Sequence, residues 1–162
     1  MEIFNINQGE LDLLVGGPPC QGFSKNVPRK NRFLEDPRNQ LIKVFLDYCE
    51  VLKPRLIILE NVAEMKNGFD KAYTDEILFR LEAQNYTVTY MVLNAADFGV
   101  PQRRRRAFFI ANRENVKFKS PFPTHSKDDI GLFALPNYVT VWDAVGDLPS
   151  KEHTENEDIP CN

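Results

Sequence analysis

Residues 11–24 read LDLLVGGPPCQGFS, a short apolar run that stops at two glycines and two prolines. The run Leu11 to Val15 has the length and composition of a buried strand, and Gly16 to Pro19 ends it abruptly. Cys20 therefore follows the carboxyl end of a predicted strand. In open α/β sheets this is the edge at which ligands bind.

The surroundings of Cys20 favour a reactive thiol. A single cysteine after a strand is ordinarily a small buried hydrophobe. Here residues 21–40 carry five basic side chains against only Glu35 and Asp36. A positive field stabilises the thiolate, which is the nucleophilic form. Cys20 is thus a candidate nucleophile.

A second strand ends at a carboxylate. Residues 56–59 are apolar on both faces, as a central parallel strand requires, and Glu60 follows them. Between the two strands, apolar residues recur at helical spacing from Leu41 to Leu52, and Lys53-Pro54 ends this helix. The alternation predicts neighbouring parallel strands that bring Cys20 and Glu60 to one edge of a sheet.

The remaining elements complete an α/β pattern. A second helix is predicted over about 71–84, and residues 86–93 and 107–110 have the composition of strands paired as a hairpin. The sequence therefore predicts an α/β fold whose sheet is mostly parallel, with an antiparallel terminal hairpin. Residues 113–140 show little periodicity.

Three motifs, in this order and spacing, resemble core motifs of the DNA cytosine-5 methyltransferase family. They are Gly16-Gly-Pro-Pro-Cys-Gln-Gly-Phe-Ser24, Glu60-Asn-Val62 and Gln102-Arg-Arg-Arg-Arg106, with Asp97 to Gln102 leading into the last and Val141 to Pro149 after it. The resemblance covers roughly residues 10–150 and is carried by several motifs together. It implies a partial Rossmann-like class I methyltransferase fold. Residues 1–150 would be the central and carboxyl-terminal part of the catalytic domain, and residues 151–162 an acidic tail or the start of a recognition domain.

The resemblance also implies an activity. A methyl group would pass from S-adenosylmethionine to C5 of a cytosine flipped out of double-stranded DNA, through a covalent cysteine adduct, in a bacterial restriction-modification system. Cys20 would attack C6 of the base. Glu60 would donate to N3, for which burial would have to raise its pKa. Arg104 and Arg106 would reach the active site, with Arg106 donating to cytosine O2.

Further residues acquire roles by the same resemblance. The Pro18 carbonyl would accept from the cytosine amino group, and Gln21 and Ser24 would contact the DNA backbone. Arg103 would be a phosphate contact or solvated, as would Arg105. Pro19 and Leu41 would lie beside the cofactor, and Asn61 would hold the turn after Glu60.

Composition agrees with a cytoplasmic protein. The 162-residue chain is 43% hydrophobic and carries a net charge of -3, but its basic residues cluster in residues 25–38 and 103–106, which leaves a local DNA face. No apolar run reaches the roughly 18 residues of a membrane span. The three cysteines form no Cys-x-x-Cys pair, which argues against a zinc site and suits a reducing compartment.

Two alternatives stay open, together with the question of a partner. The motifs also suit the tRNA-methylating branch of the family, or a truncated regulatory or binding subunit without turnover. Nothing before Leu11 resembles the Gly-rich turn that holds the cofactor. We therefore expect a complementary polypeptide to carry the cofactor-binding motifs and a target-recognition domain, and the isolated chain to be inactive.

Overall fold

The structure, a computed structural model, describes residues 6–19, 40–66, 72–127 and 134–148. The chain divides into two units. The first spans Met1–Asn94 and Arg104–Pro123, and the second spans Ala95–Arg103 and Thr124–Asn162. Cys20, Gln21, Ser24 and the segment 151–162 lie outside the described residues.

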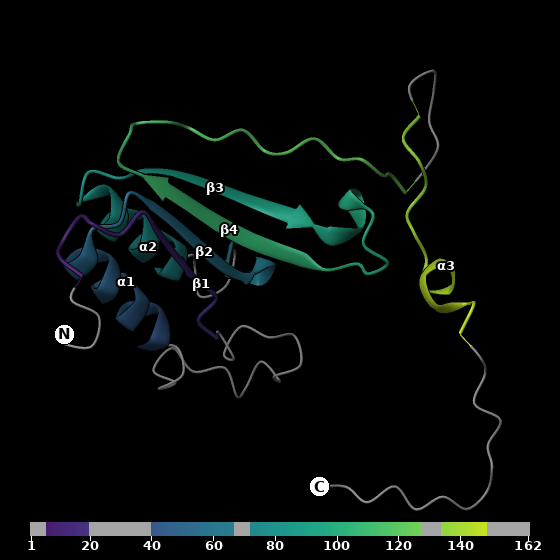
Figure 1. Ribbon diagram of the computed structural model, residues 1–162, viewed down its shortest axis with the longest axis horizontal. Coiled ribbons are helices and arrows are strands. Elements are labelled where there is room, and N and C mark those ends of the chain that lie inside the picture. The colour runs from purple at the N-terminus through teal and green to yellow at the C-terminus, as the bar shows by residue number, and fades with distance from the viewer. Residues whose placement is uncertain (1–5, 20–39, 67–71, 128–133, 149–162) are drawn as a thin grey trace, which may run out of the picture. The chain divides into compact units, whose positions relative to one another are not determined.

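The first unit is built on a four-stranded sheet of order β1-β2-β4-β3 (Figure 1). Its strands are β1 (Leu13–Gly16), β2 (Leu56–Val62), β3 (Thr87–Asn94) and β4 (Arg105–Asn112). The β1–β2 pair is parallel, whereas β4 is antiparallel to both β2 and β3. The predicted neighbouring strands and terminal hairpin are therefore present, but a mostly parallel sheet is not confirmed. The sheet is mixed because β4 inserts between β2 and β3.

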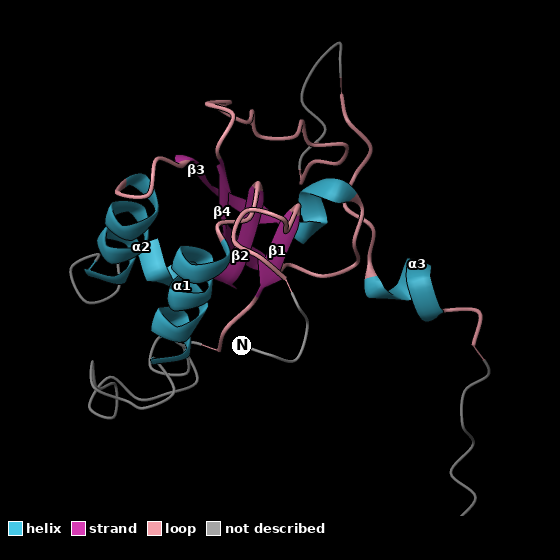
Figure 2. Cartoon of the chain, turned by 60° about the vertical axis from the view of Figure 1, so that its left-hand side comes forward, coloured by secondary structure: helices cyan, strands magenta, loops and turns pink. Residues whose placement is uncertain are grey.

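Helices α1 (Gln40–Leu52) and α2 (Ala72–Glu82) lie on the same face of this sheet (Figure 2). Each helix is followed by a residue with positive φ, Lys53 at 47° and Asn85 at 64°. A left-handed residue at this place ends a helix, and asparagine tolerates it well. Pro54 then removes the next backbone donor, which explains why the chain turns into β2 here.

The core lies between the helices and the sheet. Alternate residues of the two central strands point into it, including the directly paired Leu59 and Phe109. From α1, the buried side chains are Ile42, Leu46 and Cys49. The apolar residues Leu41, Val44 and Tyr48 of that helix are exposed. The polar residues of α1 (Gln40, Lys43, Asp47 and Glu50) share one face, and the broad apolar face opposite them is only partly buried against the sheet.

One glycine explains how closely α1 approaches β1. A Cβ atom on Gly16 would lie 2.4 Å from the Phe45 ring. Any side chain at residue 16 would collide with this core aromatic, so the helix can pack against the strand only over a glycine. The packing fixes the end of β1, where the chain leaves the sheet toward Pro18.

The second unit has little regular structure. It contains a 3-10 helix at Ala95–Phe98 and the short helix α3 (Val141–Val145). The Asp97 carbonyl accepts from the backbone N–H groups of Thr124 and His125. Thr140 and Asp143 form a reciprocal capping box at the start of α3. No helix among the described residues of the chain is long and apolar enough to cross a membrane.

Candidate active site

The candidate site forms where β1 and β2 end side by side. The parallel ladder closes with the pair Gly16 and Leu59. Beyond that pair, Glu60 and Asn61 continue in β2, because β4 still pairs with them. Glu60 was predicted just past the end of its strand, but it lies inside β2, which extends to Val62.

Glu60 is paired with two arginines. Arg106 Nε lies 2.8 Å from Glu60 Oε1, and Arg104 reaches the same oxygen at 3.9 Å. Both side chains come from the same side of the chain around the start of β4, as alternation along an extended backbone requires. The Glu60 side chain is 35% exposed. Its carboxylate is therefore held by two arginine side chains at the end of the sheet and is not enclosed in an apolar pocket.

The second oxygen of Glu60 faces β1. A Cβ atom on Gly17 would lie 3.3 Å from Glu60 Oε2, which is a tight contact. The absence of a side chain at residue 17 leaves this oxygen room beside the strand exit. From the sequence, Gly17 was predicted only to help end the first strand. The doubled glycine was the available signal, since Gly16 faces Phe45 and Gly17 faces Glu60.

Asn61 ties the two strand ends together. Its side chain is buried, with 3% of the residue exposed. Asn61 Oδ1 accepts from the Val62 N–H at 2.8 Å within β2; the turn predicted directly after Glu60 is absent, because the strand continues to Val62. Asn61 Nδ2 donates to the Pro18 carbonyl at 3.0 Å. The contact to Pro18 was not foreseen from the sequence.

The other predicted site residues are distributed over both units. Pro19 and Leu41 are exposed in the first unit, and Pro18 is half-buried. Arg103 is exposed in the second unit, where it lines a hollow of about 400 Å³ with Gln102, Tyr138 and Thr140. Gln102, the first residue of the third motif, lies before β4, which begins only at Arg105.

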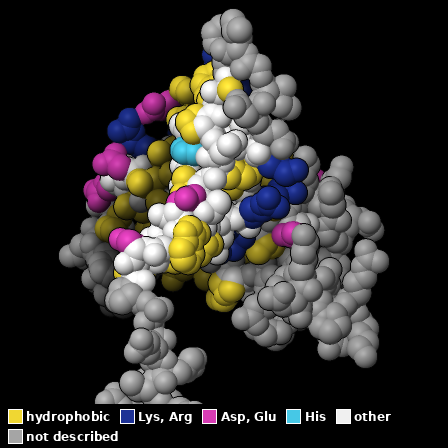
Figure 3. Space-filling view, turned by 90° about the vertical axis from the view of Figure 1, so that its right-hand side faces the viewer, with side chains coloured by type: hydrophobic (Ala, Val, Ile, Leu, Met, Phe, Trp, Pro, Cys, Tyr) yellow, Lys and Arg dark blue, Asp and Glu magenta, His cyan; other side chains and the backbone are white. Residues whose placement is uncertain are grey.

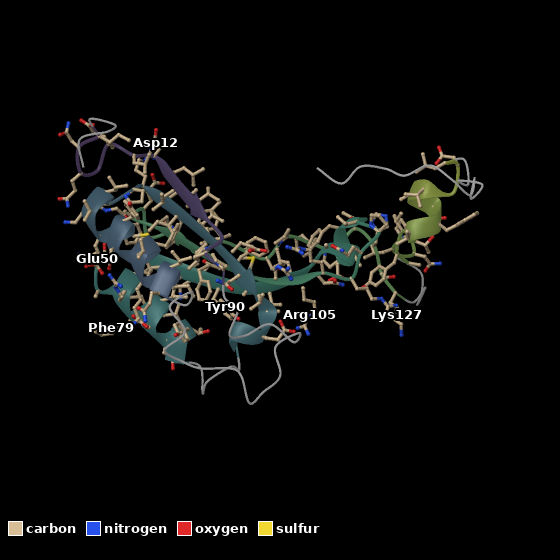
Figure 4. All side chains as sticks on the ribbon, turned by 90° about the horizontal axis from the view of Figure 1, so that it is seen from below. Asp12, Glu50, Phe79, Tyr90, Arg105 and Lys127 are labelled. Atoms are coloured by element: carbon tan, nitrogen blue, oxygen red, sulfur yellow. The ribbon has the colours of Figure 1, made fainter. Side chains whose placement is uncertain are left out.

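Figure 3 shows a group of Lys and Arg side chains on the face that it draws. Within the first unit, Arg105 marks the sheet end that carries the candidate site, and Asp12 marks the opposite end (Figure 4). Arg105 itself is exposed, and its carbonyl accepts from the Arg106 guanidinium at 2.8 Å. Among the described residues, no group of three or more His, Cys, Asp or Glu side chains is placed to hold a metal ion.

The arrangement can do two things chemically. The Glu60 carboxyl and the Pro18 carbonyl place polar atoms at the same end of the sheet. Pro18 lies two residues before Cys20 in the chain. The guanidinium groups of Arg104 and Arg106 fix the carboxyl and leave donors over, because a guanidinium carries five N–H bonds. Such a set suits recognition of a planar heterocycle.

Comparison with known proteins identifies the family of the chain. The profile of C-5 cytosine-specific DNA methylases matches residues 1–159. The chain belongs to this methylase family. It is 38% identical to the type II methyltransferase M1.HphI of Haemophilus parahaemolyticus over 152 residues, which is 94% of this chain and 38% of that protein.

Two further methylases extend the comparison. The type II methyltransferase M.AquIA of a Picosynechococcus strain is 39% identical over 164 residues, covering 92% of this chain and 65% of that protein. A solved structure of a putative DNA modification methyltransferase from an Escherichia coli prophage superposes with a TM-score of 0.59 at 29% identity. It covers 86% of this chain and 35% of that structure. This methylase chain therefore spans between about a third and two thirds of the length of these three relatives.

Proposed function

We propose that the protein is the catalytic portion of a DNA cytosine-5 methyltransferase from a restriction-modification system. The observation that carries this proposal is the position of Glu60. Its carboxyl is held by Arg106 at 2.8 Å, beside the strand exit that leads through Pro18 to Cys20. Family membership over residues 1–159 supports the same reaction. S-adenosylmethionine would supply the methyl group when bound.

In this proposal Cys20 is the nucleophile. Its thiolate bonds to C6 of a flipped cytosine, and the electron pair of the C5–C6 double bond moves onto C5 and the ring. Charge then develops toward N3, where Glu60 donates a hydrogen bond or a proton. Adding the thiolate in this way makes C5 nucleophilic enough to accept a methyl group.

Three groups would hold the base while this happens. Arg106 donates to cytosine O2 while its Nε keeps Glu60 in place, and Arg104 supports the same carboxyl from the side. The Pro18 carbonyl accepts from the exocyclic amino group. Glu60, Arg106 and Pro18 thus meet three neighbouring polar positions on one edge of the ring.

DNA contacts outside the base pocket are proposed for Gln21, Ser24 and Arg103. Arg103 is exposed at a hollow of the second unit, and an exposed guanidinium suits a phosphate contact. We assign residues 1–150 to the catalytic domain and 151–162 to an acidic tail or the beginning of a recognition domain. Since its substrate is DNA, the protein would act in the bacterial cytoplasm, where the nucleoid lies.

Pro19 and Leu41 fit one part of the cofactor. Both are exposed, and Leu41 lies in the first turn of α1, the helix that packs on β1, so they suit an apolar wall beside the bound S-adenosylmethionine. Apolar contacts alone do not bind the ribose hydroxyls or the carboxylate of this ligand. Polar partners for those groups would have to come from outside the described residues.

A complementary polypeptide would complete the fold. In the described sheet β1 is an edge strand, and its side chains Leu13 and Val15 are exposed. An edge strand that also exposes apolar side chains is a surface on which another strand can pair. On α1, Val44, Tyr48 and Val51 form an exposed stripe at helical spacing. We propose that the cofactor-binding part of a Rossmann-like sheet pairs with β1 and covers this stripe.

The test is methylation of nucleic acid. The chain is incubated with S-adenosylmethionine carrying a deuterated methyl group, alone and together with a polypeptide that carries the cofactor-binding motifs. Unmethylated DNA and tRNA are offered separately, and the nucleosides are analysed by mass spectrometry. We expect labelled 5-methyldeoxycytidine from DNA, abolished by Cys20→Ser and retained in Cys161→Ser. Label found only in tRNA, or in neither nucleic acid, would contradict the proposal.

A further inference from the structure

The exit of β1 lacks the backbone donors that would continue its ladder. The last backbone pair joins Gly16 to Leu59. After Gly17 come Pro18 and Pro19, and neither proline has an N–H group. The chain that leads to Cys20 therefore leaves the sheet without the hydrogen bonds that would normally fix its direction.

The side chain of Asn61 takes the place of the missing ladder bond. It comes from β2, 43 residues away in sequence, and donates to the Pro18 carbonyl at 3.0 Å. Its own oxygen is held by the Val62 N–H at 2.8 Å, so the amide cannot rotate without losing a bond. Because Asn61 is buried with 3% exposure, water offers little compensation for a lost bond.

This bond connects two groups that the proposed function uses. Asn61 directly follows Glu60, and its side-chain amide donates a hydrogen bond to the Pro18 carbonyl. Under the proposed function, Glu60 meets N3 of the base and the Pro18 carbonyl meets the amino group on the adjacent carbon. A carbonyl oxygen has two lone pairs, so the bond from Asn61 leaves one for the base.

We propose that Asn61 is a positioning residue that sets the choice of cytosine, by fixing the Pro18 carbonyl relative to Glu60; this inference rests on the proposed function. Cytosine presents an amino donor at this position, whereas uracil presents a carbonyl acceptor. A carbonyl held firmly in place accepts from the first base and repels the second. A carbonyl free to turn away loses the bond to cytosine and also avoids the repulsion by uracil.

The experiment compares the two bases at one site. The recognition sequence is first mapped by sequencing DNA methylated by the active assembly. Duplexes then carry deoxycytidine or deoxyuridine at the target position, and single-turnover methylation rates are measured for each. Asn61→Asp keeps the size of the side chain and the acceptor for Val62, but replaces the donor to Pro18. We expect the ratio of the cytosine rate to the uracil rate to fall by about tenfold, the factor associated with one hydrogen bond.

Asn112→Asp is the matched control. Asn112 is also buried, at 4% exposure, and its amide donates to the Val116 carbonyl at 2.6 Å near the opposite end of the sheet. This variant should lose stability comparably and keep the wild-type rate ratio. If Asn61→Asp does not fold, as judged by circular dichroism, Asn61→Ser removes the same donor without adding a charge.

Each outcome decides the matter. Equal losses of the cytosine and uracil rates, or an unchanged ratio in the folded Asn61 variant, would overturn the positioning role while leaving the proposed function intact. A wild-type assembly that methylates neither base would overturn the proposed function, and this role of Asn61 with it.

Discussion

Arg106 and Glu60 form an ion pair between diagonally placed residues of neighbouring strands. In the β2–β4 register Glu60 lies opposite Phe108, whereas Arg106 lies opposite Val62, two residues further along. The Nε to Oε1 distance of 2.8 Å is therefore a diagonal contact, which a long side chain such as arginine can make on one face of an antiparallel pair. Two strands far apart in the chain thus share one ion pair at the candidate site.

The proposed proton donation by Glu60 predicts how loss of its carboxyl group should act. Glu60→Gln keeps the shape of the side chain but cannot donate a proton to the base as a carboxylic acid does. We expect the methylation rate to fall by about 100-fold to 10,000-fold, with a much smaller change in DNA affinity. Single-turnover kinetics and a DNA-binding titration measure the two effects. Equal losses in rate and affinity would argue against the assigned role.

Arg103 should behave differently from the pair that holds Glu60. If Arg103 contacts a phosphate, Arg103→Ala should weaken DNA binding on all sequences and reduce the slope of log affinity against log salt by about one. Arg113→Ala is the control, because Arg113 is exposed beyond the end of β4, away from the candidate site. A slope that changes equally in both variants, or in neither, would show that Arg103 does not contact a phosphate.

Two tyrosines at the sheet predict opposite effects on stability. The Tyr86 hydroxyl donates to the buried Pro54 carbonyl at 2.6 Å, whereas the buried Tyr90 hydroxyl has no hydrogen-bond partner among the described residues. Tyr86→Phe should lower the free energy of unfolding by about 1–3 kcal/mol, because it leaves the carbonyl unsatisfied. Tyr90→Phe should leave it unchanged or raise it by about 1 kcal/mol.

Urea unfolding of both variants measures these changes. The Tyr90 ring should keep its packing on Phe109, whose centroid lies 4.7 Å away, so only the hydroxyl is tested. A clear destabilisation by Tyr90→Phe would mean that the hydroxyl has a partner outside the described residues.

Cys49 predicts a loss of stability in alkali. Burial raises the pKa of this thiol from 9.0 to about 12. Between these values the unfolded chain releases the thiol proton and the folded chain keeps it, so the free energy of unfolding falls as the pH rises. The thiol of Cys49 should account for about 1 kcal/mol of the loss between pH 8 and pH 10. Cys49→Ala should lose correspondingly less over that interval in urea unfolding, and an identical loss would exclude the thiol as its source.

Much of the fold follows from local pattern. The apolar runs at Leu11 to Val15 and Leu56 to Leu59, with a helix between them, were enough to predict two neighbouring parallel strands. The insertion of β4 between β2 and β3 was not predictable in this way, because strand order depends on tertiary pairing. Helix α3 was missed because five residues give no measurable periodicity, although Thr140 and Asp143 carry its capping signal.

For the candidate site, motif resemblance proposed residues but gave no geometry. Motif resemblance named Glu60, Arg104 and Arg106, and the structure brings these three together. The bond from Asn61 to Pro18 could not be foreseen, because it joins residues 43 positions apart and depends on the register of two strands. Likewise, the expected burial of Glu60 was replaced by an ion pair at a partly open edge.

Trapping of the covalent adduct tests the central claim most directly. Duplex DNA with 5-fluorocytosine at the mapped target is incubated with the active assembly and S-adenosylmethionine, and the adduct is located by peptide mass spectrometry. Fluorine cannot leave C5 as a proton does, so the bond between the enzyme sulfur and C6 persists. We predict one adduct, on Cys20, that Cys20→Ser abolishes and Cys161→Ser retains. An adduct on another cysteine, or one undiminished in Cys20→Ser, would contradict the account.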